Sequence, residues 1–134
     1  MLKDIPHPKV ENIAISVIRE YSEEGEQEWN VYVLNVRNEP IEGVLVSSKG
    51  YGHYEGREVK TTTLRHYLGR IEGNSAKKIE PIIDNLFGLN NEYWLSYFIN
   101  RVMYDKKYVF LPETIKEDHF TKIPILNKQG VMIQ

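Results

Sequence analysis

The sequence predicts an all-β fold: a two-sheet antiparallel sandwich of immunoglobulin-like architecture, with a small β-barrel as the alternative. Short segments alternate apolar and polar residues, turn residues separate them at short intervals, and helical signals are confined to one or two short turns. Seven segments are predicted as strands: 11–21, 28–37, 41–52, 58–65, 74–80, 91–100 and 106–112. The Cys…Trp…Cys pattern of antibody domains is absent, so the prediction covers architecture alone.

The first two strands are predicted from period-two alternation and β-branched residues. Segment 11–21 places Ile13, Ile15 and Val17 on one face. Segment 28–37 is apolar on both faces, which is typical of a central strand covered on both sides. An acidic turn with Gly25 near its middle separates the two strands.

The run SKGYGHYEGREVKTTTLRHYLGR, residues 48–70, combines glycines, tyrosines, histidines and basic residues. Gly50, Gly52 and Gly56 allow the positive φ angles of a hairpin loop, and a threonine-rich strand follows them. The spacing matches neither GxGxxG nor GxxxxGK[ST], and no helix pattern follows, so we interpret the run as a hairpin rather than a phosphate-binding loop.

Leu64, Leu68 and Ile71 have a helical spacing, but three threonines precede them and Gly69 and Gly73 interrupt them. Extended or irregular structure is therefore predicted for this segment. Next, PIIDNLFG predicts one or two helical turns, with Pro81 in the first position and Gly88 just past the end. Segments 91–100 and 106–112 alternate clearly and are joined by a short link, which predicts a strand pair.

The chain of 134 residues is predicted to form one domain, residues 1–134, with an N-terminal extension at 1–10 and a C-terminal packing tail at 113–134. The tail contains Ile123, Ile125, Leu126 and the segment 131–133, which are too many apolar side chains to leave in water. We therefore expect the tail to pack along a sheet, in its own subunit or in a neighbouring one.

Composition argues against several classes of protein. The net charge is 17 − 19 = −2, so no global field attracts nucleic acid or an anionic membrane. The chain has no cysteine, which excludes disulfides and thiolate chemistry and fits a reducing compartment. No apolar run approaches the roughly 20 residues of a membrane span. We expect a soluble, cytoplasmic protein with no membrane contact.

Several phrases resemble a group of small bacterial single-domain proteins of unassigned function, some of which carry a phenylalanyl-tRNA synthetase subunit label. These phrases are NVYVLN at 30–35, GVLVSSKGYG at 43–52, TTLRHYLG at 62–69, KIEPI at 78–82 and MYDKKYVFLPETI at 103–115. The resemblance covers most of the chain and implies structural motifs, with no catalytic residues to carry over.

The sequence contains no recognisable catalytic or metal-binding motif. The arginine motifs of a class II synthetase are not reproduced around Arg37 or Arg101, and no GxSxG elbow exists. His53, His66 and His119, like His7, lack the i, i+2 or i, i+4 partner that would place two metal ligands on one face. We predict no enzyme activity, no catalytic residues, no metal site and no cofactor.

Binding is the predicted activity. Nine tyrosines and two tryptophans exceed the needs of a small core, and these residues are enriched at contact surfaces. A protein partner or a homodimer is therefore expected. The alternative is weak single-stranded RNA or tRNA binding by residues 49–70, whose local charge is 5 − 2 = +3 with interleaved tyrosines. The candidate surface comprises Tyr51, His53, Tyr54, Arg57, Lys60, Arg65, His66 and Tyr67.

Overall fold

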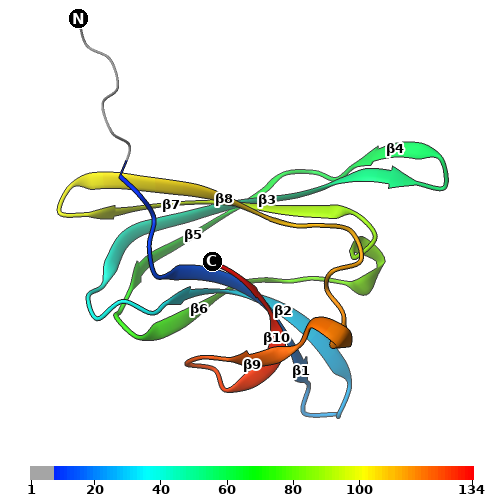
Figure 1. Cartoon of the computed structure of the whole chain (residues 1–134), viewed down its shortest axis with the longest axis horizontal. Helices are drawn as coiled ribbons and strands as arrows, with labels where there is room; N and C mark the ends of the chain where they lie inside the picture. The colour runs from blue at the N-terminus through cyan, green and yellow to red at the C-terminus, as the bar shows by residue number, and fades with distance from the viewer. Residues whose placement is uncertain (1–7) are drawn as a thin grey trace, which may run out of the picture.

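Two antiparallel sheets pack face to face in the computed structural model, which describes residues 8–134 (Figure 1). The prediction of an all-β sandwich is confirmed. The alternative of a small barrel is wrong, because neither sheet closes on itself. The predicted N-terminal extension falls mostly on residues 1–7, outside the described part of the chain.

The described residues form ten strands rather than the seven predicted. The first sheet, called sheet A, has the order β6 (Ser75–Pro81), β2 (Gln27–Asn35), β1 (Ile13–Tyr21), β10 (Lys128–Ile133) and β9 (Thr121–Ile123). The second, sheet B, has the order β4 (Arg57–Lys60), β3 (Ile41–Tyr54), β7 (Asn90–Ile99) and β8 (Val102–Phe110), and β5 (Leu64–Ile71) pairs with β3 beside β4. Two short 3₁₀ turns complete the structure: η1 (Asp84–Leu86) and η2 (Glu117–His119).

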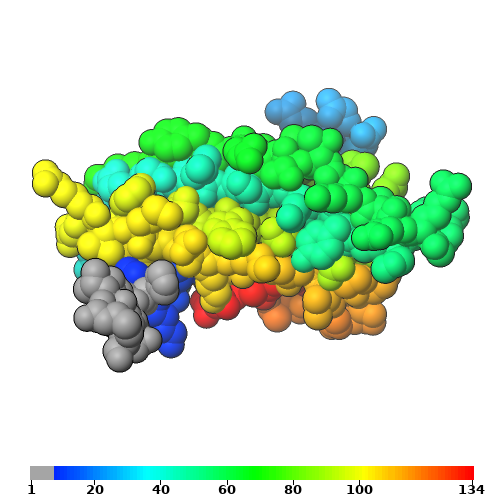
Figure 2. Space-filling model, turned by 90° about the horizontal axis from the view of Figure 1, so that it is seen from above, coloured from blue at the N-terminus to red at the C-terminus, as the bar shows by residue number. Residues whose placement is uncertain are grey.

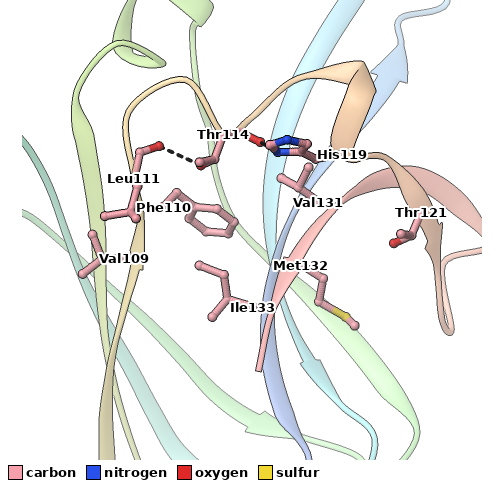
Figure 3. Close-up of a pocket in the computed structure, with 9 residues that line it drawn as sticks. All are labelled: Val109, Phe110, Leu111, Thr114, His119, Thr121, Val131, Met132 and Ile133. Atoms are coloured by element: carbon pink, nitrogen blue, oxygen red, sulfur yellow. Dashed lines mark hydrogen bonds between the residues drawn. The ribbon is translucent and has the colours of Figure 1, made fainter.

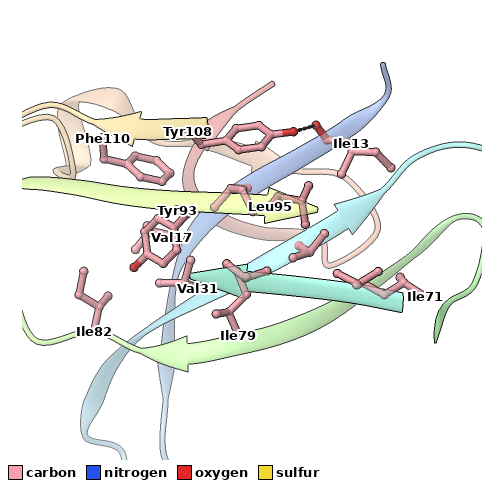
Figure 4. Close-up of a cluster of buried hydrophobic side chains, with 14 of the residues drawn as sticks. Ile13, Val17, Val31, Ile71, Ile79, Ile82, Tyr93, Leu95, Tyr108 and Phe110 are labelled. Carbon is pink, nitrogen blue, oxygen red and sulfur yellow. Dashed lines mark hydrogen bonds between the residues drawn. The ribbon is translucent and has the colours of Figure 1, made fainter. Parts of the chain in front are cut away.

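The main core lies between the sheets, where the period-two alternation of each strand directs its apolar residues (Figure 4). Ile13, Ile15 and Val17 of β1 are fully buried there, as their spacing predicts. Sheet B contributes aromatic residues, and Tyr108 donates a hydrogen bond across the layers to the Ile13 carbonyl at 2.7 Å. Each buried aliphatic side chain stabilises the fold by roughly 1.5–3 kcal/mol.

A second apolar cluster covers the outer face of sheet A. Its buried members are Ala14, Ile18, Leu34 and Ile123. The turn between β9 and β10 supplies part of the cover, because Ile125 and Leu126 pack against the same cluster. This arrangement explains why β2 is apolar on both faces, as predicted for a central strand covered on both sides.

The glycine-rich run is a hairpin, but its glycines play different parts. Gly50 and Gly52 lie inside β3, and the turn itself is formed by Glu55 and Gly56, with φ of 51° and 76°. Two successive positive φ angles are those of a two-residue type I′ turn. The β3–β4 hairpin projects beyond the body of the molecule (Figure 1).

The predicted strand at 58–65 is two strands rather than one. β4 ends at Lys60, and β5 begins at Leu64. Between them, Thr61 bonds to Gly50 of β3 twice, since its amide donates to the Gly50 carbonyl and its hydroxyl accepts from the Gly50 amide, both at 2.8 Å. Segment 64–71, predicted as extended or irregular, is strand β5.

The helical turn predicted at residues 81–88 is shorter than expected. Pro81 is the last residue of β6 rather than the first of a helix, and one 3₁₀ turn follows at Asp84–Leu86. The C-terminal tail does more than pack on a sheet. Its last strand, β10, lies within sheet A between β1 and β9.

Glu20 lies on β1 near the turn to β2, beside the second apolar cluster. Its carboxylate accepts hydrogen bonds from Asn30 Nδ2 at 2.9 Å and Tyr32 Oη at 2.7 Å, and it forms an ion pair with Lys128 of β10. Burial alone raises the pKa of Glu20, but these three donors together outweigh it and lower the pKa below its usual 4.5.

This depressed pKa predicts acid-sensitive stability. The contribution of Glu20 is present above pH 4.5 and is lost as the pH falls through the lower value of the folded state. We expect Glu20→Gln to unfold more easily at neutral pH and to lose less stability on acidification than the wild type. Denaturant titrations from pH 7 to pH 3 measure both effects. Glu58→Gln is the control, because the exposed Glu58 carboxylate makes no ion pair within residues 8–134, and equal curves for both variants would contradict the expectation.

Candidate interaction surface

The strand register decides which side chains of sheet B face outward. Residues opposite one another in an antiparallel pair share a face. One row across the sheet is Tyr67, Leu45, Ser96 and Asp105, and the next row is Arg65, Ser47, Trp94 and Lys107. We call this side of sheet B the outer face. Figure 2 looks onto it, with β5, β3, β7 and β8 running from green through cyan to yellow and orange.

Large apolar side chains stand exposed on the outer face. Tyr67 is 73% exposed, and Trp94 of the central strand β7 is 46% exposed. The same face also exposes Leu45, Phe98 and Met103. Gly43 makes room for this group, because a Cβ there would lie 3.2 Å from the Phe98 ring. An aromatic group of this kind is a typical feature of contact surfaces.

Charged side chains surround the aromatic group in nearly equal numbers of each sign. Trp94 Nε1 donates to Asp105 at 3.2 Å, and Lys107 lies 5.8 Å from the Trp94 ring centre. Lys49 forms an ion pair with Glu92 at 3.8 Å. The outward register positions carry four bases and four acids: Lys49, Lys60, Arg65, Lys107, Glu42, Glu58, Glu92 and Asp105. Arg70 of β5 adds a fifth base, which is paired with Glu42.

The structure does not bring all eight candidate residues onto one surface. Five of them share the outer face: Tyr51, His53, Lys60, Arg65 and Tyr67. The other three face the opposite way: Tyr54, Arg57 and His66. Alternation along β3 separates neighbouring residues in this way, and only the register assigns each one to a face.

His66 takes part in a polar cluster that joins β5 of sheet B to β6, an edge strand of sheet A. Its Nε2 lies 2.7 Å from Oε1 of Glu80 on β6, and Ser48 Oγ donates to the same oxygen at 2.8 Å. Tyr93 donates to the other carboxylate oxygen at 3.3 Å. Burial, and next the Glu80 charge, raise the pKa of Tyr93 well above its usual value. Tyr93 is therefore a neutral donor at physiological pH.

Beside this cluster, a hollow of about 220 Å³ opens at the edge of the sandwich, with Leu64, Ile82 and Leu86 in its wall. A second hollow of about 310 Å³ lies at the other edge, between β8 and β10 (Figure 3). Phe110, Val131 and Ile133 line it from the two sheets. No group of three histidine, aspartate or glutamate side chains that could hold a metal occurs within residues 8–134.

Sequence reasoning missed Trp94 and Phe98 of the outer face and Glu80 of the polar cluster. The alternation of Trp94 and Phe98 with buried residues was visible in segment 91–100, but both faces of that segment are apolar. Periodicity therefore could not tell the outer side from the inner one. Glu80 gave no signal, because its partners come from three other strands.

Over residues 8–134, the structure contains no helix of the length and apolar character needed to cross a membrane. Comparisons with protein-family models, curated proteins and solved structures give no match to this chain.

Proposed function

We propose that this chain is a non-catalytic β-sandwich that binds a protein partner through the outer face of sheet B. The exposed aromatic and aliphatic group around Trp94 and Tyr67 carries the proposal. Tyrosine and tryptophan provide large contact area with few rotatable bonds, and they are common among the residues that dominate binding energy. The absence of cysteine supports a cytoplasmic location for this activity.

The charges favour a protein over the alternative, single-stranded RNA. Nucleic-acid surfaces carry a clear excess of positive charge, whereas the outer face has balanced charges. The local +3 of residues 49–70 is also dispersed in space. Arg57 faces away from Arg65, and Arg70 is paired with both Glu42 and Glu72.

The test compares partner capture by matched variants. We expect the double variant Tyr67→Ser/Trp94→Ser to lose at least about tenfold in captured partner relative to the wild type, because both removed groups lie at the centre of the contact. Tyr54→Ser is the control, since Tyr54 is 58% exposed but lies on the opposite side of the hairpin. Quantitative pull-downs from native lysate, with melting curves for every variant, give the measurement.

Equal capture by the control and the double variant would contradict the proposal. Titration with labelled single-stranded RNA at two salt concentrations tests the alternative. Binding that weakens with salt and with Arg65→Ala would assign the same face to RNA instead, since phosphate contacts release counterions.

A further inference from the structure

Strand β8 has a free edge. It pairs with β7 on one side, and within residues 8–134 no strand pairs with its other side. Along nine residues, alternate N–H and C=O groups are therefore directed away from the sheet, which is the arrangement that a further strand can join.

The residues of β8 are self-complementary about their midpoint. From Val102 to Phe110 the sequence is VMYDKKYVF, centred on Lys106. If the strand lies antiparallel to a second copy of itself with Lys106 on the two-fold axis, residues at equal distances from Lys106 face one another. Asp105 then lies opposite Lys107, Met103 opposite Val109, and Tyr104 opposite Tyr108. A two-fold interface requires this kind of match, because the same surface serves both subunits.

We propose that two copies of the chain associate through β8 in this register and form one continuous sheet. The charge pairs support the register, because Asp105 and Lys107 both lie on the outer face and would meet twice, once on each side of the axis. This pairing joins strand edges and does not require the proposed partner binding by the outer face, although Asp105 and Lys107 also contact Trp94 of that face.

Two further features bear on the register. Lys106 faces its own copy on the axis, and this like-charge contact opposes the pairing. Within its own chain, the Lys106 amine lies 5.1 Å from the ring centre of Tyr108. At the ends of the pair, the exposed Val102 and Met103 reach the Phe110 end of the other subunit. The apolar hollow between β8 and β10 opens beside that end (Figure 3).

Disulfide trapping tests the axis directly, since the chain has no cysteine of its own. Residues opposite one another on the axis have Cα atoms about 4.5–5.5 Å apart, within the range of a disulfide. We expect Lys106→Cys to form a covalent dimer under mild oxidation at least about tenfold faster than Lys60→Cys, which places its thiol on the opposite edge of sheet B. Equal rates for the two variants would overturn the proposal.

Charge reversal tests the register. Asp105→Lys places a lysine opposite Lys107 twice, so we expect the dimer dissociation constant to rise at least about tenfold. The double variant Asp105→Lys/Lys107→Asp should restore it to within about threefold, whereas Glu58→Lys at the other edge should leave it unchanged. Light scattering across a concentration series gives the constants. A wild type that stays monomeric throughout, or a double variant no better than Asp105→Lys, would overturn the proposal.

Discussion

Deletion of residues 121–134 is expected to unfold the domain. The deletion removes β9 and β10, and β10 pairs with the central strand β1 from Ile15↔Ile133 to Ile18↔Gly130. It also removes the buried side chains of Ile123 and Val131, which contribute roughly 1.5–3 kcal/mol each. That sum, with the exposure of β1 added, approaches the roughly 5–15 kcal/mol that stabilises a typical domain. We expect the cooperative melting transition to disappear, as measured by circular dichroism.

Two smaller changes separate the role of β10 from the loss of chain length. Gly130→Ala should destabilise strongly, because a Cβ there would lie 2.3 Å from the Val17 carbonyl oxygen and 3.1 Å from Ile18 Cα. Gln129→Ala, at an exposed position of the same strand, should melt like the wild type. A deletion variant that keeps the wild-type melting curve would show that β10 contributes no stability.

The sandwich could be predicted from the sequence because its strands follow simple alternation. Ile13, Ile15 and Val17 all enter the core, and β2 is apolar on both sides because a second cluster covers sheet A. The hairpin turn could also be predicted, because Gly56 occupies a position that requires a positive φ angle.

The added strands and the surface depend on long-range pairing, which local patterns do not contain. The tail joins sheet A as a strand because β10 pairs with β1, which lies more than 100 positions earlier in the chain. Arg57 and Arg65 are close in sequence, but the register places them on opposite faces of sheet B. Alternation gives two faces for every strand, and only the packing partner decides which one is buried.

The role of Glu80 also depends on long-range pairing and could not be predicted from the local sequence. It lies on β6, the edge strand of sheet A, and its three partners come from β3, β5 and β7 of sheet B. At the other side of the sandwich, the hydrogen bond from Tyr108 to Ile13 joins the sheets. Polar contacts therefore connect the two layers at both edges, and apolar side chains fill the space between them (Figure 4).

Replacement of Glu80 by alanine is expected to destabilise the fold by about 2–4 kcal/mol. Ser48 and Tyr93 are buried, and both lose the acceptor of their hydroxyl groups in the variant. A buried donor left without a partner costs about 1–3 kcal/mol, and water reaches the partly exposed His66 more easily than the other two. Equilibrium denaturation in urea gives the free energy of unfolding, provided that the slope of the transition is unchanged.

Matched variants assign this loss to the hydrogen bonds. Glu80→Gln keeps an acceptor oxygen for Ser48 and His66, so it should lose about half as much stability as the alanine variant. Glu58→Ala removes an exposed carboxylate of the hairpin and should stay within about 0.5 kcal/mol of the wild type. If Glu80→Ala unfolds at the same urea concentration as Glu58→Ala, the cluster contributes nothing to the joining of the sheets. A loss in Glu80→Gln as large as in Glu80→Ala would instead attribute the stability to the charge.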